Sequence, residues 1–252
     1  MQARERILIA LDTSELDQAV HWVRTLSPYV GGFKVGLELT HAAGFGVFER
    51  LREAGAQRLF YDAKLHDIPN TVAKAVRAIA RLGVWMVNVH ASGGRSMMEA
   101  AVEAARSAPE PPLLIAVTVL TSLSSQELRE QLGTRRGAAN QVLHLATLAK
   151  EAGMDGVVAS AQEASTLRRR LGTGFLLVTP GIRLAGDAVG DQRRVMTPLQ
   201  ALRAGADYLV LGRSITAHPE PVARMVALLE ELESALTSRA NTPKEASDET
   251  AP

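Results

Sequence analysis

The chain has 252 residues, and 28 Lys and Arg residues nearly balance 27 Asp and Glu residues, which leaves a formal net charge of +1. Hydrophobic residues make up 46% of the chain and charged residues 22%, which excludes a chain that is disordered or fibrous throughout. A charge this close to zero argues against nucleic-acid binding by counterion release. The chain contains no cysteine, which excludes disulfides, thiolate metal sites and a cysteine nucleophile.

The N-terminal residues, MQARERILIALD, contain too short an apolar run for a signal peptide and read as a first strand. No stretch approaches the ~20 apolar residues that a membrane-spanning helix needs. We therefore expect a cytoplasmic protein that binds neither nucleic acid nor membrane.

Short β-branched runs alternate with longer helical patterns along the chain. Apolar residues recur at helical spacing in Thr71–Leu82 and Ala138–Ala152, which predicts helices there. The expected strands are Arg6–Asp12, Gly32–Glu38, Arg58–Lys64, Val84–His90, Leu113–Thr118, Gly156–Ala159, Phe175–Thr179 and Tyr208–Leu211.

Eight strand-and-helix units of about 29 residues each predict an α/β protein built as a single (β/α)₈ TIM barrel over residues 1–236. An open, doubly wound sheet is the alternative, but no glycine-rich dinucleotide fingerprint follows the first strand. Pro180–Arg194 forms a long polar loop after the seventh strand, of the kind that serves as a lid or is disordered. Residues 237–252 are polar and without periodicity, so we expect a disordered tail.

Active sites of such barrels lie at the carboxyl ends of the strands. Asp62 and Lys64 end the third strand and, being two residues apart, point to the same face. Lys34 and Asp67 add one charge of each sign, and such an alternating set costs less to bury than its members singly. The structural alternatives are an ion pair for the lysines and a helix N-cap for Asp67.

Gly212 and Arg213 end the eighth strand and open the following helix, a position that favours phosphate binding. Arg183 and Gln192, on the loop after the seventh strand, could contact the same anion. The alternative for a single loop arginine is a solvated surface charge. We expect no metal site, because the six histidines lack paired ligand spacing: His21, His41, His66, His90, His144 and His218.

The segments ALDTSE, FKVGLEL, FYDAKLHDIPNTV, NVHASGG, AVTVLTS, VTPGIR, GDQRR and ADYLVLGRSI together resemble the bacterial orotidine 5′-phosphate decarboxylases. The resemblance runs in order from about Ile7 to Ile215. It implies a homodimeric (β/α)₈ barrel that uses no cofactor and no metal. The implied reaction converts orotidine 5′-phosphate to uridine 5′-phosphate and carbon dioxide, the last step of de novo UMP synthesis.

The resemblance also implies roles for individual residues. Lys64 would protonate C6 of the pyrimidine, and Asp62, Lys34 and the partner subunit's Asp67 would complete a charged network around it. Asp12 and the partner subunit's Thr71 would hold the ribose hydroxyls, and Thr121 would bind the pyrimidine, with Ser122 a weaker candidate. The phosphate would be held by Arg183, Gln192, Gly212 and Arg213.

Two other functions remain open from the residues. A magnesium-dependent sugar-phosphate decarboxylase of the same suprafamily, of the 3-keto-gulonate 6-phosphate type, shares the Asp-x-Lys-x-x-Asp run of the third strand. Lys34, Thr121-Ser122 and the GDQ segment favour the pyrimidine nucleotide instead. A non-catalytic nucleotide-binding barrel would be expected to have lost a member of the charged set, and none is missing.

Overall fold

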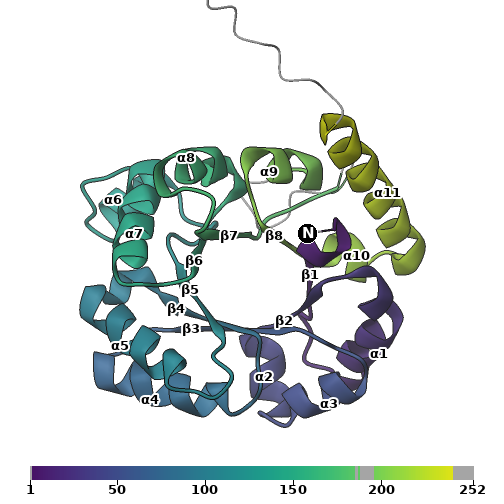
Figure 1. Cartoon of the computed structure of the whole chain (residues 1–252), viewed down its shortest axis with the longest axis horizontal. Coiled ribbons are helices and arrows are strands. Elements are labelled where there is room, and N and C mark those ends of the chain that lie inside the picture. Colours follow the sequence, from purple (N-terminus) through teal and green to yellow (C-terminus); the bar gives the residue numbers. More distant parts are fainter. Residues whose placement is uncertain (1, 185–186, 188–195, 241–252) are drawn as a thin grey trace, which may run out of the picture.

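Eight parallel strands close into a barrel in chain order, β1 to β8, with β8 paired to β1 (Figure 1). The structure is a computed structural model that describes residues 2–184, 187 and 196–240. The connecting helices form a ring around the strands. This arrangement confirms the predicted (β/α)₈ barrel and excludes the open sheet.

The strands begin and end close to their predicted positions, although most are shorter by one to three residues. At Leu37 and Glu38 the type of secondary structure differs: both were predicted to extend a strand, but both lie in a helix. Gly36 is the N-cap residue of that helix, so the helix starts at Leu37 and the strand stops before it. The bounds are β1 Ile7–Ala10, β2 Gly32–Val35, β3 Leu59–Leu65, β4 Met86–His90, β5 Leu113–Val117, β6 Gly156–Val158, β7 Leu176–Thr179 and β8 Tyr208–Leu211.

The helices also follow the predicted pattern. The helix predicted at Thr71 begins two residues earlier, at Pro69, whose fixed φ suits the first turn. The α-helices are α1 Leu16–Leu26, α2 Leu37–Ala43, α3 Val47–Glu53, α4 Pro69–Ala80, α5 Arg95–Arg106, α6 Ser125–Glu130, α7 Ala138–Glu151, α8 Ala161–Leu171, α9 Pro198–Ala204, α10 Arg213–Thr216 and α11 Pro221–Ala240. Three 3₁₀ turns are η1 Arg4–Arg6, η2 Ser27–Tyr29 and η3 Ala91–Gly93.

The last helix is longer than expected. The tail was predicted to begin at residue 237, but α11 continues to Ala240. Its added turn is continuous with the backbone before it, and the Thr237 hydroxyl donates to the Glu233 carbonyl as in a regular helix. The remainder of the predicted tail, residues 241–252, lies outside the described residues.

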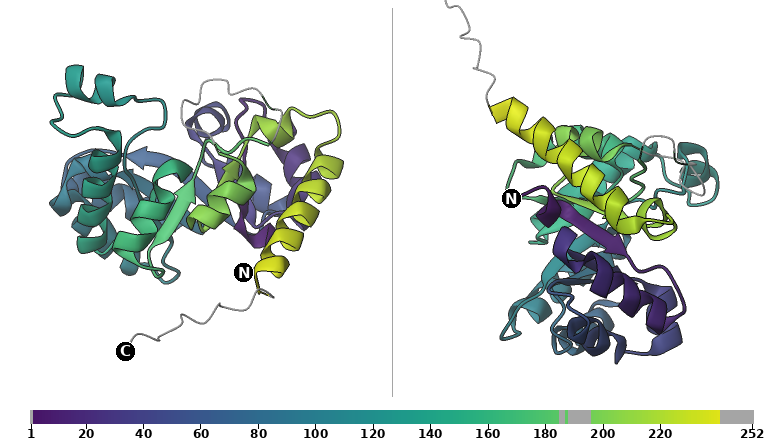
Figure 2. Two further views of the ribbon diagram at one scale, coloured as in Figure 1. Left: turned by 90° about the horizontal axis from the view of Figure 1, so that it is seen from above. Right: turned by 90° about the vertical axis from the view of Figure 1, so that its right-hand side faces the viewer.

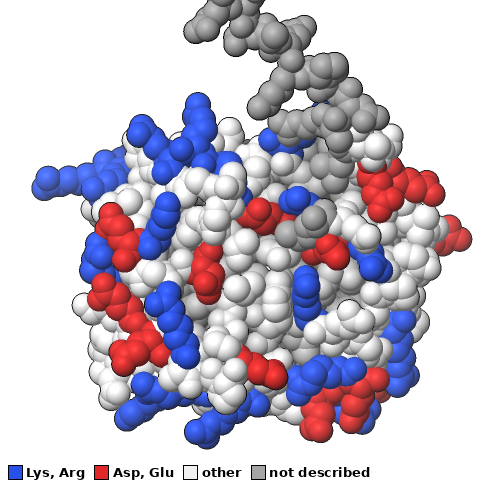
Figure 3. All heavy atoms as spheres, viewed as in Figure 1, with Lys and Arg blue, Asp and Glu red and all other residues white. Residues whose placement is uncertain are grey.

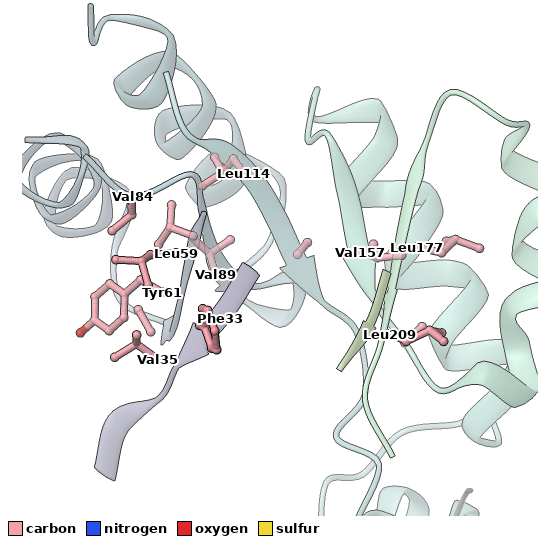
Figure 4. Close-up of a cluster of buried hydrophobic side chains, with 14 of the residues drawn as sticks. Phe33, Val35, Leu59, Tyr61, Val84, Val89, Leu114, Val157, Leu177 and Leu209 are labelled. Atoms are coloured by element: carbon pink, nitrogen blue, oxygen red, sulfur yellow. The ribbon is translucent and has the colours of Figure 1, made fainter. Parts of the chain in front are cut away.

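The hydrophobic core has two layers because side chains alternate across each strand. One layer fills the barrel and contains Leu8, Ala10, Phe60, Met86, Ile115, Val178, Tyr208 and Val210. The other lies between the strands and the surrounding helices, and Figure 4 shows part of it, including Phe33, Leu59, Val89 and Leu177. Two residues beyond the inward-facing Ala10 and Phe60 come Asp12 and Asp62, so the apolar layer gives way to carboxylates at this end of the barrel.

The two ends of the barrel differ. Figure 2 shows α6 standing above one rim, while the N-terminal turn η1 lies at the opposite end.

In the view of Figure 3, acidic and basic side chains intermingle around the ring of helices and do not form a face of one sign. Within the described part of the chain, no helix combines the length and apolar character needed to cross a membrane.

Candidate active site

A cavity of about 370 Å³ lies at the carboxyl ends of the barrel strands. Its walls combine apolar side chains, such as Phe60, Val158 and Val210, with polar groups from the ends of the strands. Closure of the barrel brings these groups together although they are far apart in sequence. Of the residues expected at the site, the cavity is lined by Asp12, Lys34, Asp62, Lys64, Thr121, Ser122, Arg183, Gly212 and Arg213.

Four of these residues form a continuous chain of ion pairs. The Lys34 ammonium lies 3.0 Å from Asp12 Oδ1 and 3.4 Å from Asp62 Oδ2. The Lys64 ammonium lies 2.8 Å from Asp62 Oδ1. The side chains of Lys34 and Asp62 are only 11% and 12% exposed, so each charge needs its neighbours of opposite sign. The order Asp12–Lys34–Asp62–Lys64 therefore alternates in sign.

These contacts shift the pKa values of the two central groups. Burial by itself would raise the pKa of the Asp62 carboxyl, but the charges of Lys34 and Lys64 and hydrogen bonds from Lys64 and Asn88 outweigh it and lower the pKa. Burial would lower the pKa of Lys34, but the carboxylates of Asp62 and Asp12 outweigh it and raise the pKa. Both groups are thus held in their charged forms around neutral pH.

The backbone at Lys64 is unusual. Its φ of 49° is the only positive value for a non-glycine residue in the described part of the chain. The register between β3 and β4 shifts between Tyr61 and Leu65, so the left-handed residue lies in an irregular stretch of the strand. This conformation costs about 1–2 kcal/mol for a residue with a Cβ. The surrounding contacts must offset that cost.

Asn88 on β4 is a polar residue of the site to which the sequence assigned no role. It is fully buried, its Nδ2 donates to Asp62 Oδ1 at 2.7 Å, and its Oδ1 accepts from the Lys64 amide at 2.7 Å. A signal existed in the sequence, because Asn88 lies two residues beyond the inward-facing Met86. The signal becomes specific only once β4 is known to pair with β3.

Two expected site residues do not reach the cavity of their own chain. Asp67 and Thr71 are exposed, and Asp67 Oδ1 accepts a hydrogen bond from the Ile68 amide at 2.6 Å. The N-cap position of α4 is Ile68 and has no side-chain cap, so the alternative reading of Asp67 as an N-cap is wrong. Within one chain, Asp12 and not Asp67 supplies the second carboxylate of the charged set.

Arg183 and Arg213 line both the central cavity and a second cavity of about 290 Å³. The second cavity is also lined by Asp187 and Arg224, which form an ion pair between the loop after β7 and α11. Guanidinium groups bind phosphate by charge-assisted hydrogen bonds, so two arginines lining one space make it a candidate phosphate site. Gln192, the other residue expected here, lies outside the described residues.

The histidines nearest the site are His66 and His90, whose ring centroids are 5.5 Å apart. Burial, followed by the charges of His66 and Lys64, lowers the pKa of His90. Among the described residues, no group of three or more His, Cys, Asp or Glu side chains is arranged to hold a metal ion.

Comparison with known proteins agrees with this geometry. Residues 5–228 match the model of the orotidine 5′-phosphate decarboxylase / HUMPS family. The chain is 52% identical over 238 residues to orotidine 5′-phosphate decarboxylase of Moorella thermoacetica, covering 92% of this chain and 94% of the relative. It is 54% identical over 220 residues to the protein of that name from Pseudoalteromonas translucida, covering 87% and 93%.

A solved structure supports the same assignment. The crystal structure of orotidine 5′-phosphate decarboxylase from Lactobacillus acidophilus is similar with a TM-score of 0.79 and 38% identity, covering 90% of this chain and 98% of that chain. The family match, over residues 5–228, spans all eight strands and therefore includes every strand end that lines the cavity. The chain belongs to the orotidine 5′-phosphate decarboxylase / HUMPS family.

Proposed function

We propose that the chain is a carboxy-lyase that converts orotidine 5′-phosphate to uridine 5′-phosphate and carbon dioxide without a cofactor or metal. The observation that carries the proposal is the Asp12–Lys34–Asp62–Lys64 chain of ion pairs, in a cavity that Arg183 and Arg213 also line. Family membership supports the same reaction.

Lys64 is the proton donor in this proposal. Loss of carbon dioxide leaves an electron pair at C6 in the plane of the pyrimidine, where the ring π system cannot delocalise it. A fixed ammonium stabilises that developing charge without reorganising and then gives its proton to C6. Lys64 suits this role because it ends the ion-pair chain and its side chain, 31% exposed, borders the cavity.

Asp62 and Lys34 hold Lys64 in place. Asp62 Oδ1 contacts the Lys64 ammonium, and Asp62 Oδ2 faces Lys34. Lys34 is in turn paired with Asp12, so each of the two buried charges, Lys34 and Asp62, is held between two charges of opposite sign. Slow uncatalysed reactions demand up to ~23 kcal/mol of barrier lowering, and a fixed charge of this kind contributes without losing energy to reorganisation.

The rest of the cavity suits the other parts of the nucleotide. Arg183, Gly212 and Arg213 would bind the phosphate, together with Gln192 as expected from the sequence. Asp12, with its side chain 58% exposed, has room to accept from a ribose hydroxyl while it remains paired with Lys34. Thr121 lines the same cavity and would bind the pyrimidine.

The active form is proposed to be a cytoplasmic homodimer in which the partner subunit's Asp67 and the partner subunit's Thr71 complete each site. Both residues of this chain are exposed and neither lines its own cavity, so both are accessible to a neighbouring subunit. Ile68, between them, is 66% exposed, and Phe45 and Leu37 are 56% and 45% exposed. A subunit interface that includes them would remove these apolar side chains from water.

Ultraviolet absorbance tests the reaction directly, because the pyrimidine chromophore changes when C6 loses its carboxylate. Purified protein in excess chelator is expected to convert orotidine 5′-phosphate completely and to release one carbon dioxide per nucleotide. Dependence on added magnesium, or turnover of a 3-keto sugar phosphate instead, would contradict the proposal. Nucleotide binding without turnover would indicate a binding protein.

A further inference from the structure

We infer that Asn88 is a positioning residue for the decarboxylation, because its amide fixes the Asp62 carboxylate and the Lys64 backbone relative to each other. The inference rests on the proposed function, since the position of Lys64 matters to turnover only if Lys64 donates the proton. Asn88 itself does not line the cavity and is not placed to touch the substrate.

The geometry joins two neighbouring strands at one side chain. Asn88 lies on β4 with 0% of its surface exposed. Its Nδ2 donates to Asp62 Oδ1 at 2.7 Å and its Oδ1 accepts from the Lys64 amide at 2.7 Å. The same Asp62 oxygen lies 2.8 Å from the Lys64 ammonium. The Asn88 side-chain amide therefore holds the Lys64 backbone directly, and it positions the Lys64 ammonium indirectly, through Asp62.

The chemistry of the two partners dictates which side chain can serve here. An ionised carboxylate only accepts hydrogen bonds and a backbone N–H only donates them. The residue at position 88 must therefore donate to one neighbour and accept from the other, which fixes the orientation of the Asn88 amide. An ionised aspartate of the same shape could accept from Lys64 but would repel Asp62. A leucine of the same size could do neither.

Position matters because the Lys64 backbone is not in a relaxed conformation. Its φ of 49° falls in the left-handed region, at the irregular stretch between Tyr61 and Leu65. The bond from the Lys64 amide to Asn88 holds that backbone, and without it the residue can relax toward an ordinary extended strand. Such a change would move the base of the Lys64 side chain. A shift of about 1 Å at a reacting group can cost about 10²-fold in rate.

Asn88→Asp and Asn88→Leu test the inference by the pH dependence of kcat. In Asn88→Asp two carboxylates lie at hydrogen-bond distance, which raises the pKa of the pair. At low pH the new carboxyl is protonated and can donate to Asp62 as the amide does. As pH rises it ionises and repels Asp62. We expect kcat to be about 10²-fold below wild type above neutral pH, with the ratio to wild type rising several-fold as pH falls.

Asn88→Leu cannot regain a donor, so its kcat should remain low at every pH. Inhibition by uridine 5′-phosphate, which lacks the carboxylate, should stay near the wild-type value in both variants because the phosphate and ribose contacts are unchanged. Ser160→Ala is the matched control. Ser160 is also fully buried and near a strand end, but its side chain accepts from the Gln162 amide at the start of α8. It should lower stability and leave the kcat profile unchanged.

A second pair of variants at position 88 tests the inference if Asn88→Asp and Asn88→Leu do not fold. Asn88→Ser and Asn88→Ala differ by one hydroxyl, which can both donate and accept, so the serine variant should be about tenfold more active or better. The inference is overturned if the Asn88→Asp ratio is independent of pH, if serine and alanine are equally active, or if nucleotide binding falls in parallel with kcat. An inactive wild-type protein would refute the proposed function instead.

Discussion

The ammonium of Lys64 lies 2.8 Å from Oδ1 of Asp62, although the two residues are separated by only one position on the same strand. Alternation along a strand places both side chains on the inward face, but a regular strand would hold them side by side and parallel. The left-handed backbone at Lys64 changes the direction of its side chain. The left-handed backbone at Lys64 and the ion pair between Lys64 and Asp62 thus occur together.

Lys64→Ala is expected to abolish turnover while nucleotide binding survives. The substitution removes the only proposed proton donor, whereas Arg183 and Arg213 still line the cavity. A general acid contributes ~10²–10⁴-fold, so a folded variant that kept more than about a hundredth of the activity would refute the role. Lys150→Ala is the control, because Lys150 lies on α7 and donates to the Leu171 carbonyl away from the cavity. Its activity should equal that of the wild type.

Arg213→Ala should harm catalysis as well as binding. Phosphate contacts that are remote from C6 contribute to the rate when they order the site around the substrate. We expect kcat/KM for orotidine 5′-phosphate to fall by about 2–3 kcal/mol, or roughly 30- to 150-fold. Turnover of orotidine, which lacks the phosphate, should hardly change.

The exposed Arg203 at the end of α9 provides the matched control for Arg213. Arg203→Ala removes the same charge from the chain without touching the cavity, so it should leave both substrates unaffected. If Arg213→Ala reduced the turnover of both substrates equally, Arg213 would not be a phosphate ligand.

Stability should fall at both ends of the pH range because of Asp62 and Lys34. The folded-state pKa of Asp62 is lowered, so its contribution is present above its unfolded pKa of about 3.9 and is lost as pH falls through the folded value. The folded-state pKa of Lys34 is raised, so its contribution is present below its unfolded pKa of about 10.4 and is lost as pH rises through the folded value.

Urea unfolding of Asp62→Asn at several pH values measures the acid part of this effect. Near neutral pH the variant should be about 3 kcal/mol less stable, at the low end for a broken buried pair because Asp12 still neutralises Lys34. The difference from wild type should shrink as pH drops below about 4, because the wild-type carboxylate then takes up a proton. A difference that stayed constant down to the acid transition would contradict the shifted pKa.

The proposed dimer predicts complementation between two inactive variants. Lys64→Ala and Asp67→Ala homodimers should both be nearly inactive if each site combines Lys64 with the partner subunit's Asp67. After subunit exchange about half of the dimers are hybrids, and one of the two sites in each hybrid is intact. Activity should therefore recover to about a quarter of the wild-type value.

Mass spectrometry of tagged subunits establishes whether hybrids have formed. If exchange is complete and no activity returns, each site is built within a single chain and the exposed position of Asp67 has another cause. Mixing Lys64→Ala with Asp62→Asn is the control, because both lesions lie in one chain's ion-pair set. The hybrid sites are then all defective, so no recovery is expected.

The fold could be predicted from the sequence because its signals are local. Alternation of strand and helix patterns repeats eight times, and this period leaves few architectures other than a closed barrel. Errors were confined to the ends of elements, as at Leu37 and Glu38, where the helix starts immediately after Gly36. The last turn of α11 was also missed, because its polar composition resembles that of the residues beyond it.

For the candidate site, too, some features could be predicted from the sequence and others depend on the tertiary structure. The sequence determined which charged residues stand at the strand ends, and the two-residue period of a strand determined the inward direction of Asp62. Only the tertiary structure decided that Asp12 pairs with Lys34 and that Asn88 bridges Asp62 to the Lys64 backbone. It also decided that Asp67 lies outside the ion-pair chain of its own subunit. Those contacts depend on the register between strands and on one left-handed residue, which arise from closing the barrel and leave no periodic signal in the chain.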